Sequence, residues 1–348
     1  MNKYRSPEKY STIASLSEAC RLLLSVVIAS ICSVFMQAAT ATSSGKSQIS
    51  AVVAVGLGGT AEYRDMFEEA ATEMTDQLLG VSDSSSAGDA TIDGASTVAL
   101  LLEDKTDRDT LLSHIDERVD FIVSQSQLGT THQFVLALFG HGSYDGEDYK
   151  FNISGPDVTA RELAEHLKPL DGMPQLLLLG TSASGAALEW LASDDRIVLT
   201  ATKSGAESNV VLFPRFWKDT LLGSDADTDH DEQLSIHEAF DYTSQAIAEH
   251  YENAQQLATE HSRIVVGANA QLSVLTRLGS LAGTESNPVV NTLLEKRDTL
   301  ENEFLAIRAT RGQKPQTQYL DELEVVLLKI AKLQREIDSE TGWSGDDQ

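Results

Sequence analysis

Apolar residues along this chain fall into two kinds of pattern. Short runs that are apolar almost throughout occupy 49–55, 97–102, 134–139, 176–179 and 196–201. Segments that predict helices lie between and after them, at 63–79, 107–126, 159–167, 185–192 and 214–222. Strands that lack polar alternation are usually covered on both faces. The alternation therefore predicts an α/β fold with a mainly parallel sheet and helices on both faces.

Local signals refine some of these elements. Thr159 and Glu162 stand in capping-box positions, so a helix is expected to begin there and to run to Leu167. The stretch 80–96 is rich in Ser, Gly and Asp and predicts a loop. Several histidines lie in helical or loop contexts and are expected at the surface: His114, His132, His166 and His250.

Chemistry-bearing residues follow three of the predicted strands. The first strand ends in the glycine-rich turn 56–59, the third in Gly140-His141-Gly142 and the fourth in Thr181-Ser182. Ligands of parallel sheets bind beyond the carboxyl ends of the strands. We therefore expect these three strand ends to converge on one cleft.

The segment 286–340 has a different character from the rest of the chain. Apolar residues recur there at coiled-coil spacing in two stretches separated by Gly312 and Pro315, which predicts a helical hairpin of two amphipathic helices. Helices this short bury little surface alone and need a neighbour. The hairpin, 291–337, is therefore expected to be a contact surface, and its neighbour could be the parent domain, a second copy or a membrane-bound partner.

The N-terminus has the features of a signal peptide. Residues 1–41 combine a long basic region, an apolar run from Leu22 to Phe35 and the small-x-small site Ala39-Thr40-Ala41. Cleavage would leave a polar linker, 42–48, and an exported protein, periplasmic or extracellular; an uncleaved anchor is the alternative. The leader holds both cysteines, Cys20 and Cys32, so the mature chain would contain no thiol.

Charge narrows the class of partner. The formal net charge is −27, and it becomes −29 without the leader, which removes four basic and two acidic residues. Phosphate backbones require clustered Lys and Arg, so a nucleic-acid partner is not expected. A strongly acidic chain fits a soluble protein, and one that collects divalent cations.

The middle of the chain resembles the legumain and caspase superfamily of cysteine peptidases. The resemblance lies in a strand, a His-Gly pair at His141-Gly142, a capped helix, an apolar strand and then Ser182-Ala183-Ser184-Gly185, which matches the family's Cys-x-Ser-Gly with serine in place of cysteine. It implies a caspase–haemoglobinase-like domain over 49–270 and a protein or peptide partner. It also implies a substrate pocket near the strand at 196–201, with these candidates: Thr202, Lys203, Ser204 and Gly205.

The serine decides which function the resemblance implies. A thiol is partly ionised near neutral pH, whereas a hydroxyl needs a well-placed base. The expected function is therefore that of a pseudopeptidase that binds or scaffolds, with His141, Gly142 and Ser182 as a degenerate site. The alternative is a serine-dependent peptidase or hydrolase that uses Ser182 and His141. In a third interpretation Ser182 only caps the helix that begins near Gly185.

A second motif predicts a calcium site. The acidic loop, 227–238, carries oxygen-bearing residues at the positions that ligate calcium in an EF-hand loop: Asp227, Asp229, Asp231, Gln233 through its carbonyl, Ser235 and Glu238. A helix is predicted after it, over 236–251. Glu232 occupies the position that is normally glycine, where a left-handed backbone costs about 1 kcal/mol for other residues.

A weaker motif occurs at the first strand end. Gly56, Gly58 and Ala61 fit the Gly-x-Gly-x-x-Ala pattern of dinucleotide-binding turns. The acidic residue that should follow about 20 positions later has no strand to carry it, since Glu103 and Asp104 come too late. No nucleotide cofactor is therefore expected, and the glycines are interpreted as a tight turn packed on the sheet.

Overall fold

The computed structural model describes residues 48–79, 90–92, 96–128, 132–228, 230–270, 274–277, 287–309, 311 and 314–342. The predicted leader and linker therefore lie outside the described residues, apart from Gln48. The described part falls within one compact unit, Lys46–Gln348. Within it, no helix combines the length and the apolarity that crossing a membrane requires.

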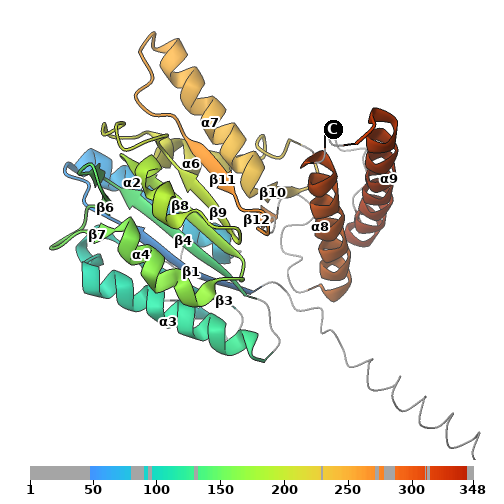
Figure 1. Cartoon of the computed structure of the whole chain (residues 1–348), viewed down its shortest axis with the longest axis horizontal. Helices are drawn as coiled ribbons and strands as arrows, with labels where there is room; N and C mark the ends of the chain where they lie inside the picture. The colour runs from blue at the N-terminus through green and yellow to red at the C-terminus, as the bar shows by residue number, and fades with distance from the viewer. Residues whose placement is uncertain are drawn as a thin grey trace, which may run out of the picture. The chain divides into compact units, whose positions relative to one another are not determined.

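A mixed, mostly parallel sheet forms the centre of the molecule (Figure 1). Its strands run in the order β11-β9-β8-β4-β1-β3-β2. The inner strands pair in parallel: β1 (Gln48–Val55), β3 (Ser96–Leu101), β4 (His132–Gly140), β8 (Gln175–Thr181) and β9 (Arg196–Thr200). The edge strands β2 (Ala90–Ile92) and β11 (Arg263–Val266) are antiparallel to their neighbours. The predicted α/β class with a mainly parallel sheet is confirmed.

The absence of polar alternation in the strands has the expected structural cause. Every residue of β8 and β9 is buried, and β4 is buried except at Gln133, because helices cover both faces (Figure 1). One apolar cluster holds α2 (Ala61–Leu79), α6 (Phe213–Leu222) and α7 (Ile236–Asn253) against one face. The other holds α3 (Arg108–Ser126), α4 (Ala160–Leu167) and α5 (Leu188–Leu191).

The helices α3 and α4 begin where the sequence predicts, and each start is capped by a side chain. Thr159 forms the full capping box with Glu162, whose carboxylate also contacts the guanidinium of Arg108 on α3. Asp107 caps α3 by accepting a hydrogen bond from the backbone N–H of Thr110 at 2.8 Å. Each cap satisfies an otherwise unpaired backbone donor at the start of a helix, which fixes the point where the chain turns from loop to helix.

Several short elements differ from the predictions. The loop predicted at 80–96 contains β2, which is held by pairing with β3. A small antiparallel sheet, not predicted, follows β4: β5 (Gly142–Tyr144), β6 (Tyr149–Phe151) and β7 (Val158–Thr159). The helix predicted at 185–192 is a 3₁₀ turn, η3 (Ser184–Ala187), followed by α5. Further 3₁₀ turns are η1 (Glu103–Lys105) and η2 (Lys168–Leu170). Strands of two or three residues carry too short a pattern to be read from sequence, and only their partners stabilise them.

The expectation that His132 lies at the surface is wrong. Its side chain is 2 % exposed at the start of β4, where the ring meets the Phe121 ring edge-on at 5.2 Å. Neither ring nitrogen has a hydrogen-bond partner among the described residues. Burial therefore lowers the pKa of His132 and keeps the imidazole neutral.

Two long helices, α8 (Pro288–Ala309) and α9 (Gln316–Thr341), end the described chain. They form an apolar cluster of their own from Val290, Leu293, Leu294, Leu333 and Ile337. This cluster is separate from the two that cover the sheet. The α8–α9 pair therefore packs chiefly on itself.

Candidate functional site

Strand pairing brings His141 and Ser182 to the same edge of the sheet. β4 and β8 are parallel neighbours in which Gly140 pairs with Thr181. The residues that follow these two, His141 and Ser182, therefore leave the sheet at the same end. Gly142 lies so close to this point that a Cβ on it would be 2.4 Å from the carbonyl oxygen of Ser182. Only a glycine allows the two backbones to approach this closely.

His141 makes its contacts with the glycine-rich turn rather than with Ser182. Its Nε2 lies 3.2 Å from the carbonyl oxygen of Gly58. A carbonyl can only accept, so this hydrogen bond places a proton on Nε2. The rings of Tyr63 and Phe67 on α2 meet the imidazole edge-on, with centroids 6.1 and 5.5 Å away. The first strand end is thus joined to the His141 strand end, as the sequence predicts, and the ring is held in one orientation.

Ser182 is buried and unpaired. It is 1 % exposed, and its Oγ has no hydrogen-bond partner among the described residues. The next residue, Ala183, takes a left-handed backbone (φ 55°) and caps η3 without a side-chain hydrogen bond. The interpretation of Ser182 as a helix cap is therefore wrong. A hydrogen bond that would make His141 the base of a Ser182 nucleophile is also not formed.

Ser184, the next serine in the sequence, makes the hydrogen bonds that hold the turn after β8 in place. Ser184 Oγ accepts from the backbone N–H of Thr202 at 3.2 Å and lies 3.3 Å from Thr202 Oγ1. Thr202 Oγ1 in turn accepts from the N–H of Gly185 at 3.0 Å. A Cβ on Gly185 would be 2.2 Å from the backbone carbon of Lys203. Thr202, expected to line a substrate pocket, is therefore buried and ties the end of β9 to the Ser184 turn.

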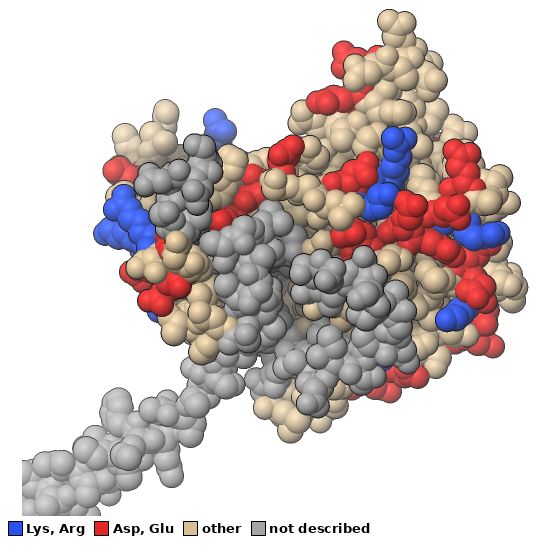
Figure 2. All heavy atoms as spheres, turned by 180° about the vertical axis from the view of Figure 1, so that it is seen from behind, with Lys and Arg blue, Asp and Glu red and all other residues tan. Residues whose placement is uncertain are grey.

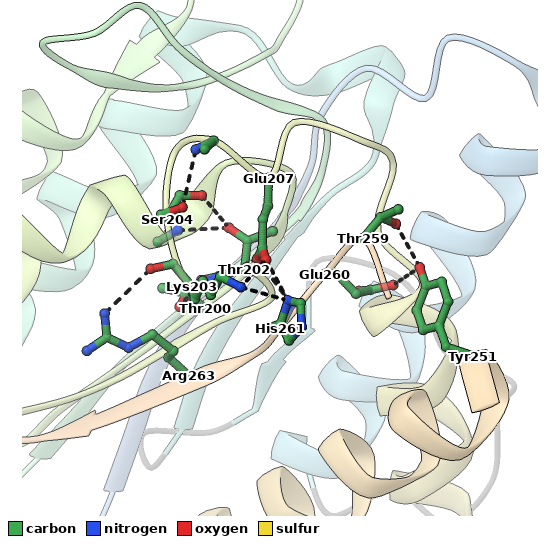
Figure 3. A network of polar contacts seen from close by, with 12 residues as sticks. Thr200, Thr202, Lys203, Ser204, Glu207, Tyr251, Thr259, Glu260, His261 and Arg263 are labelled. Atoms are coloured by element: carbon green, nitrogen blue, oxygen red, sulfur yellow. Dashed lines mark hydrogen bonds and ion pairs between the residues drawn. The ribbon is translucent and has the colours of Figure 1, made fainter. Parts of the chain in front are cut away.

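Two of the remaining pocket candidates, Lys203 and Ser204, form part of a polar network at the sheet edge (Figure 3). Glu207 accepts from the backbone N–H groups of Lys203 and His261 at 2.9 and 3.1 Å, and its Oε1 lies 2.5 Å from His261 Nδ1. The Nζ of Lys203 lies 3.3 Å from Glu207 Oε1 and 3.3 Å from His261 Nδ1. Burial alone would raise the pKa of Glu207, but these hydrogen bonds together hold it below its ordinary value.

Ser204 and Gly205 lie on the same loop. Ser204 contributes its carbonyl oxygen to the hydroxyl of Thr202 at 3.3 Å. Gly205 packs on the β5 strand, since a Cβ there would be 2.4 Å from the ring of Tyr144. The network also contains Glu207 and His261. His261 lies two residues before β11, the edge strand that pairs with β9.

A second carboxylate, that of Glu260, is buried where this loop ends and α6 begins. Glu260, 2 % exposed, accepts from the backbone N–H groups of Leu212 and Phe213 at the start of α6, at 2.8 and 3.1 Å, and from the Tyr251 hydroxyl at 3.1 Å (Figure 3). Burial raises the pKa of Glu260, although these donors oppose the shift. The carboxylate of Glu260 thus accepts hydrogen bonds from backbone N–H groups that have no partner within the helix at the start of α6.

The carboxylate of Glu103 is hydrogen-bonded to the backbone of the glycine-rich turn, 56–59. Glu103 Oε2 accepts from the N–H of Gly58 at 3.0 Å and from Arg64 Nε at 2.9 Å. In a dinucleotide-binding turn this type of N–H faces the phosphates. Gly56 is packed against the carbonyl of Asn152, which a Cβ would approach to 2.5 Å. These contacts fit the interpretation of the glycines as a tight turn.

The acidic loop is closed by hydrogen bonds between its own residues. Asp227 accepts from the N–H groups of Asp231 and Glu232, at 3.2 and 3.0 Å. Glu232 takes the left-handed backbone that its glycine-like position predicts, with φ 60°. Gln233 and Ser235 belong to β10 (Gln233–Ser235), which pairs with β12 (Val274–Arg277).

The ligands themselves are only partly gathered. Glu238 forms a capping box with Ser235 and accepts from Thr228 at 3.0 Å. Asp229, one of the expected ligands, lies outside the described residues. Among those that are described, no three acidic or histidine side chains come together closely enough to hold a metal ion.

A buried arginine from the α8–α9 pair contacts this loop. Arg297 on α8 is fully buried and donates to the carbonyl oxygen of Asp231 at 3.0 Å, with its other terminal nitrogen 3.0 Å from Asp231 Oδ2. It also donates to Gln334 of α9 at 2.6 Å and lies 3.4 Å from Glu301. One guanidinium therefore joins the loop, α8 and α9.

No protein-family model matches the sequence, and no curated protein matches it. The resemblance to the legumain and caspase superfamily therefore depends on the residues around His141 and Ser182 and on the order of elements that carries them.

Proposed function

We propose that the chain is an exported, catalytically inactive relative of the legumain-like peptidases that acts as a binding or scaffolding protein. The order of elements supports a caspase–haemoglobinase-like fold. β4 is followed by His141-Gly142, then by the capped helix α4, the buried strand β8 and the turn at Ser182. The partner would be a protein or a peptide. On the face in Figure 2, acidic side chains cover more of the described surface than basic ones, which fits a partner other than nucleic acid.

The observation that carries the proposal is the isolation of the Ser182 hydroxyl. A serine nucleophile needs a base within hydrogen-bonding distance that removes its proton. Ser182 Oγ is buried without a partner, and the His141 Nε2 proton is directed at the Gly58 carbonyl. Hydrolysis by this pair would require both groups to rearrange.

The test is peptide cleavage by the purified exported protein. We expect no cleavage after Asn, Asp or basic residues, and the same result for Ser182→Ala and His141→Ala. Turnover that is lost in both variants would overturn the proposal and establish the serine hydrolase instead. Ser182→Cys supplies the thiolate chemistry of the family, so weak cleavage by this variant would support the relationship.

Calcium is the proposed ligand of the acidic loop. Its donors are hard carboxylate, hydroxyl and carbonyl oxygens, which calcium prefers, and the left-handed Glu232 supplies the bend that the loop requires. Binding to the folded state alone would stabilise it by about 2.7 kcal/mol when free calcium is 100 times the Kd. We expect a higher melting temperature in millimolar calcium, a smaller effect of magnesium and loss of the shift in Glu238→Gln. An unchanged wild-type melting temperature would contradict the site.

A further inference from the structure

Large apolar side chains on α9 face solvent. α8 packs along one side of α9 (Figure 1), and the side chains on the rest of the helix surface are left uncovered. Four of them are between 48 and 54 % exposed: Leu320, Val325, Leu327 and Leu328. The residues 325–328 are all apolar and span a full turn, but only Val326 among them is buried. Exposed apolar residues gathered on one element are typical of an interaction surface.

Charged residues are arranged symmetrically about Leu328 on this surface. The positions 7 and 4 residues before it are acidic, and the positions 4 and 7 residues after it are basic: Asp321, Glu324, Lys332 and Arg335. Spacings of four and seven residues place side chains on one face of a helix. All four side chains are exposed, and among the described residues none of them has an ion pair or a side-chain hydrogen bond. The face thus carries two free negative charges at one end and two free positive charges at the other.

We propose that this face of α9 binds the same face of a second copy of the chain, with the two helices antiparallel about a twofold axis at Leu328. In such a contact, residue i of one copy meets residue j of the other and the reverse also holds. Asp321 then faces Arg335 of the second copy, and Glu324 faces Lys332 of the second copy. Both acid–base pairs have Leu328 as their midpoint, so one axis satisfies both. In a parallel pair, like charges would meet instead.

The apolar residues supply the affinity of this contact, and the charges set its direction. Exposed ion pairs contribute little to affinity. Val325 lies on one side of the charged stripe, and Leu320 and Leu327 lie on the other, so apolar surface is covered on both sides when two such helices meet. The stripe from Asp321 to Arg335 is about 21 Å long at 1.5 Å per residue. A contact of this size is small, so we expect a dimer with a Kd in the micromolar range.

The first measurement is sedimentation equilibrium of the purified exported protein between about 1 and 100 μM. We expect a monomer–dimer equilibrium. Leu328→Asp places two like charges at the axis and should weaken the dimer at least about 100-fold, with an unchanged circular dichroism spectrum. The matched control is Leu222→Asp on α6, where the leucine is 63 % exposed, and its Kd should stay within twofold of wild type. A wild-type monomer over the whole range, a dimer that survives Leu328→Asp, or equal loss in the control would overturn the proposal.

The second measurement reverses the charges in two variants. One variant carries Asp321→Lys and Glu324→Lys, and the other carries Lys332→Glu and Arg335→Glu. Each should be a monomer alone because its face then repels an identical face, and an equimolar mixture should form a heterodimer. The first variant has a smaller net negative charge than the wild type, so relief of general repulsion would strengthen its dimer. A dimer of this variant as strong as that of the wild type, or a mixture that stays monomeric, would overturn the charge pairing.

The third measurement gives the direction of the helices. A spin label on Gln318→Cys, an exposed position near the start of α9, is introduced in a chain with Cys20→Ser and Cys32→Ser. In the antiparallel dimer the two labelled positions lie about 30 Å apart along the helix axes, because each is ten residues from Leu328. In a parallel dimer only the spacing between neighbouring helices, about 10 Å, separates them. A short distance would overturn the antiparallel arrangement.

Discussion

The edge of the sheet at Ser182 and the acidic loop at Asp231 are held in place by different forces. At the sheet edge, buried strands and glycines that touch neighbouring backbone fix the positions of His141 and Ser182. At the loop, charge and hydrogen bonds dominate, with a left-handed glutamate and a single arginine that reaches in from α8. Packing of the first kind admits few arrangements. Contacts of the second kind depend on the charges that surround them.

Truncation of a core leucine should affect the sheet and the α8–α9 pair, which contacts the acidic loop through Arg297, to different extents. Leu178 lies in the centre of β8 and is fully buried, whereas Leu333 is 8 % exposed in the small α8–α9 cluster. Leu178→Ala should cost about 4 kcal/mol and Leu333→Ala about 2 kcal/mol. Amide hydrogen exchange should quicken throughout the sheet in the first variant and only in α8 and α9 in the second. Equal protection changes in both variants would mean that the sheet and the α8–α9 pair unfold as one unit.

Gly185 should be the most sensitive glycine at the sheet edge. A Cβ there would be 2.2 Å from the backbone of Lys203, so β9 and its loop would have to move. We expect Gly185→Ala to lower the free energy of unfolding by about 3 kcal/mol in chemical denaturation. Gly223→Ala is the control, because its Cβ would meet the Asp219 carbonyl at 3.4 Å, an ordinary contact. A loss below about 1 kcal/mol for Gly185→Ala would show that this edge adapts more easily than its packing indicates.

The acidic loop should gain stability from a glycine. Glu232 has a left-handed backbone, which costs about 1 kcal/mol for a residue with a Cβ. Glu232→Gly keeps the N–H that Asp227 accepts and should raise the unfolding free energy by about 1 kcal/mol. Calcium affinity should stay within a few fold, since the side chain of this position is not an expected ligand. A destabilised variant would mean that the Glu232 side chain itself holds the loop.

The buried imidazole of His132 should add a small dependence on acid. Its pKa is lowered in the folded state by burial, so below the unfolded value of about 6.5 the unfolded chain binds more protons. The free energy of unfolding should therefore be unaffected by His132 above that pH and fall as the pH drops below it. His132→Leu should remove this part of the slope, worth about 1 kcal/mol or less between pH 7 and pH 5. Parallel pH profiles of the two proteins would contradict the neutral buried form.

Much of the α/β part was predictable because its signals are local. Wholly apolar runs marked the inner strands, and Thr159 with Glu162 marked the start of α4 within a few residues of each other. The parallel pairing of β4 and β8 then placed His141 and Ser182 at one edge. The contact between Glu207 and His261 could not be found in this way, since 54 residues separate them and the strand β11 that follows His261 is short and half exposed.

The sequence alone determined the class of the sheet, the acidic loop and the left-handed backbone that the position of Glu232 requires. These features depend on residue type and on spacing within one helix, strand or loop, and both can be taken directly from the sequence. The tertiary structure decided that Ser182 Oγ has no partner among the described residues, that the His141 proton is directed at Gly58 and that Arg297 reaches Asp231. Each of these joins or separates residues across tens of positions in the chain, and only the packing of the helices and strands sets the distances on which hydrogen bonds and ion pairs depend.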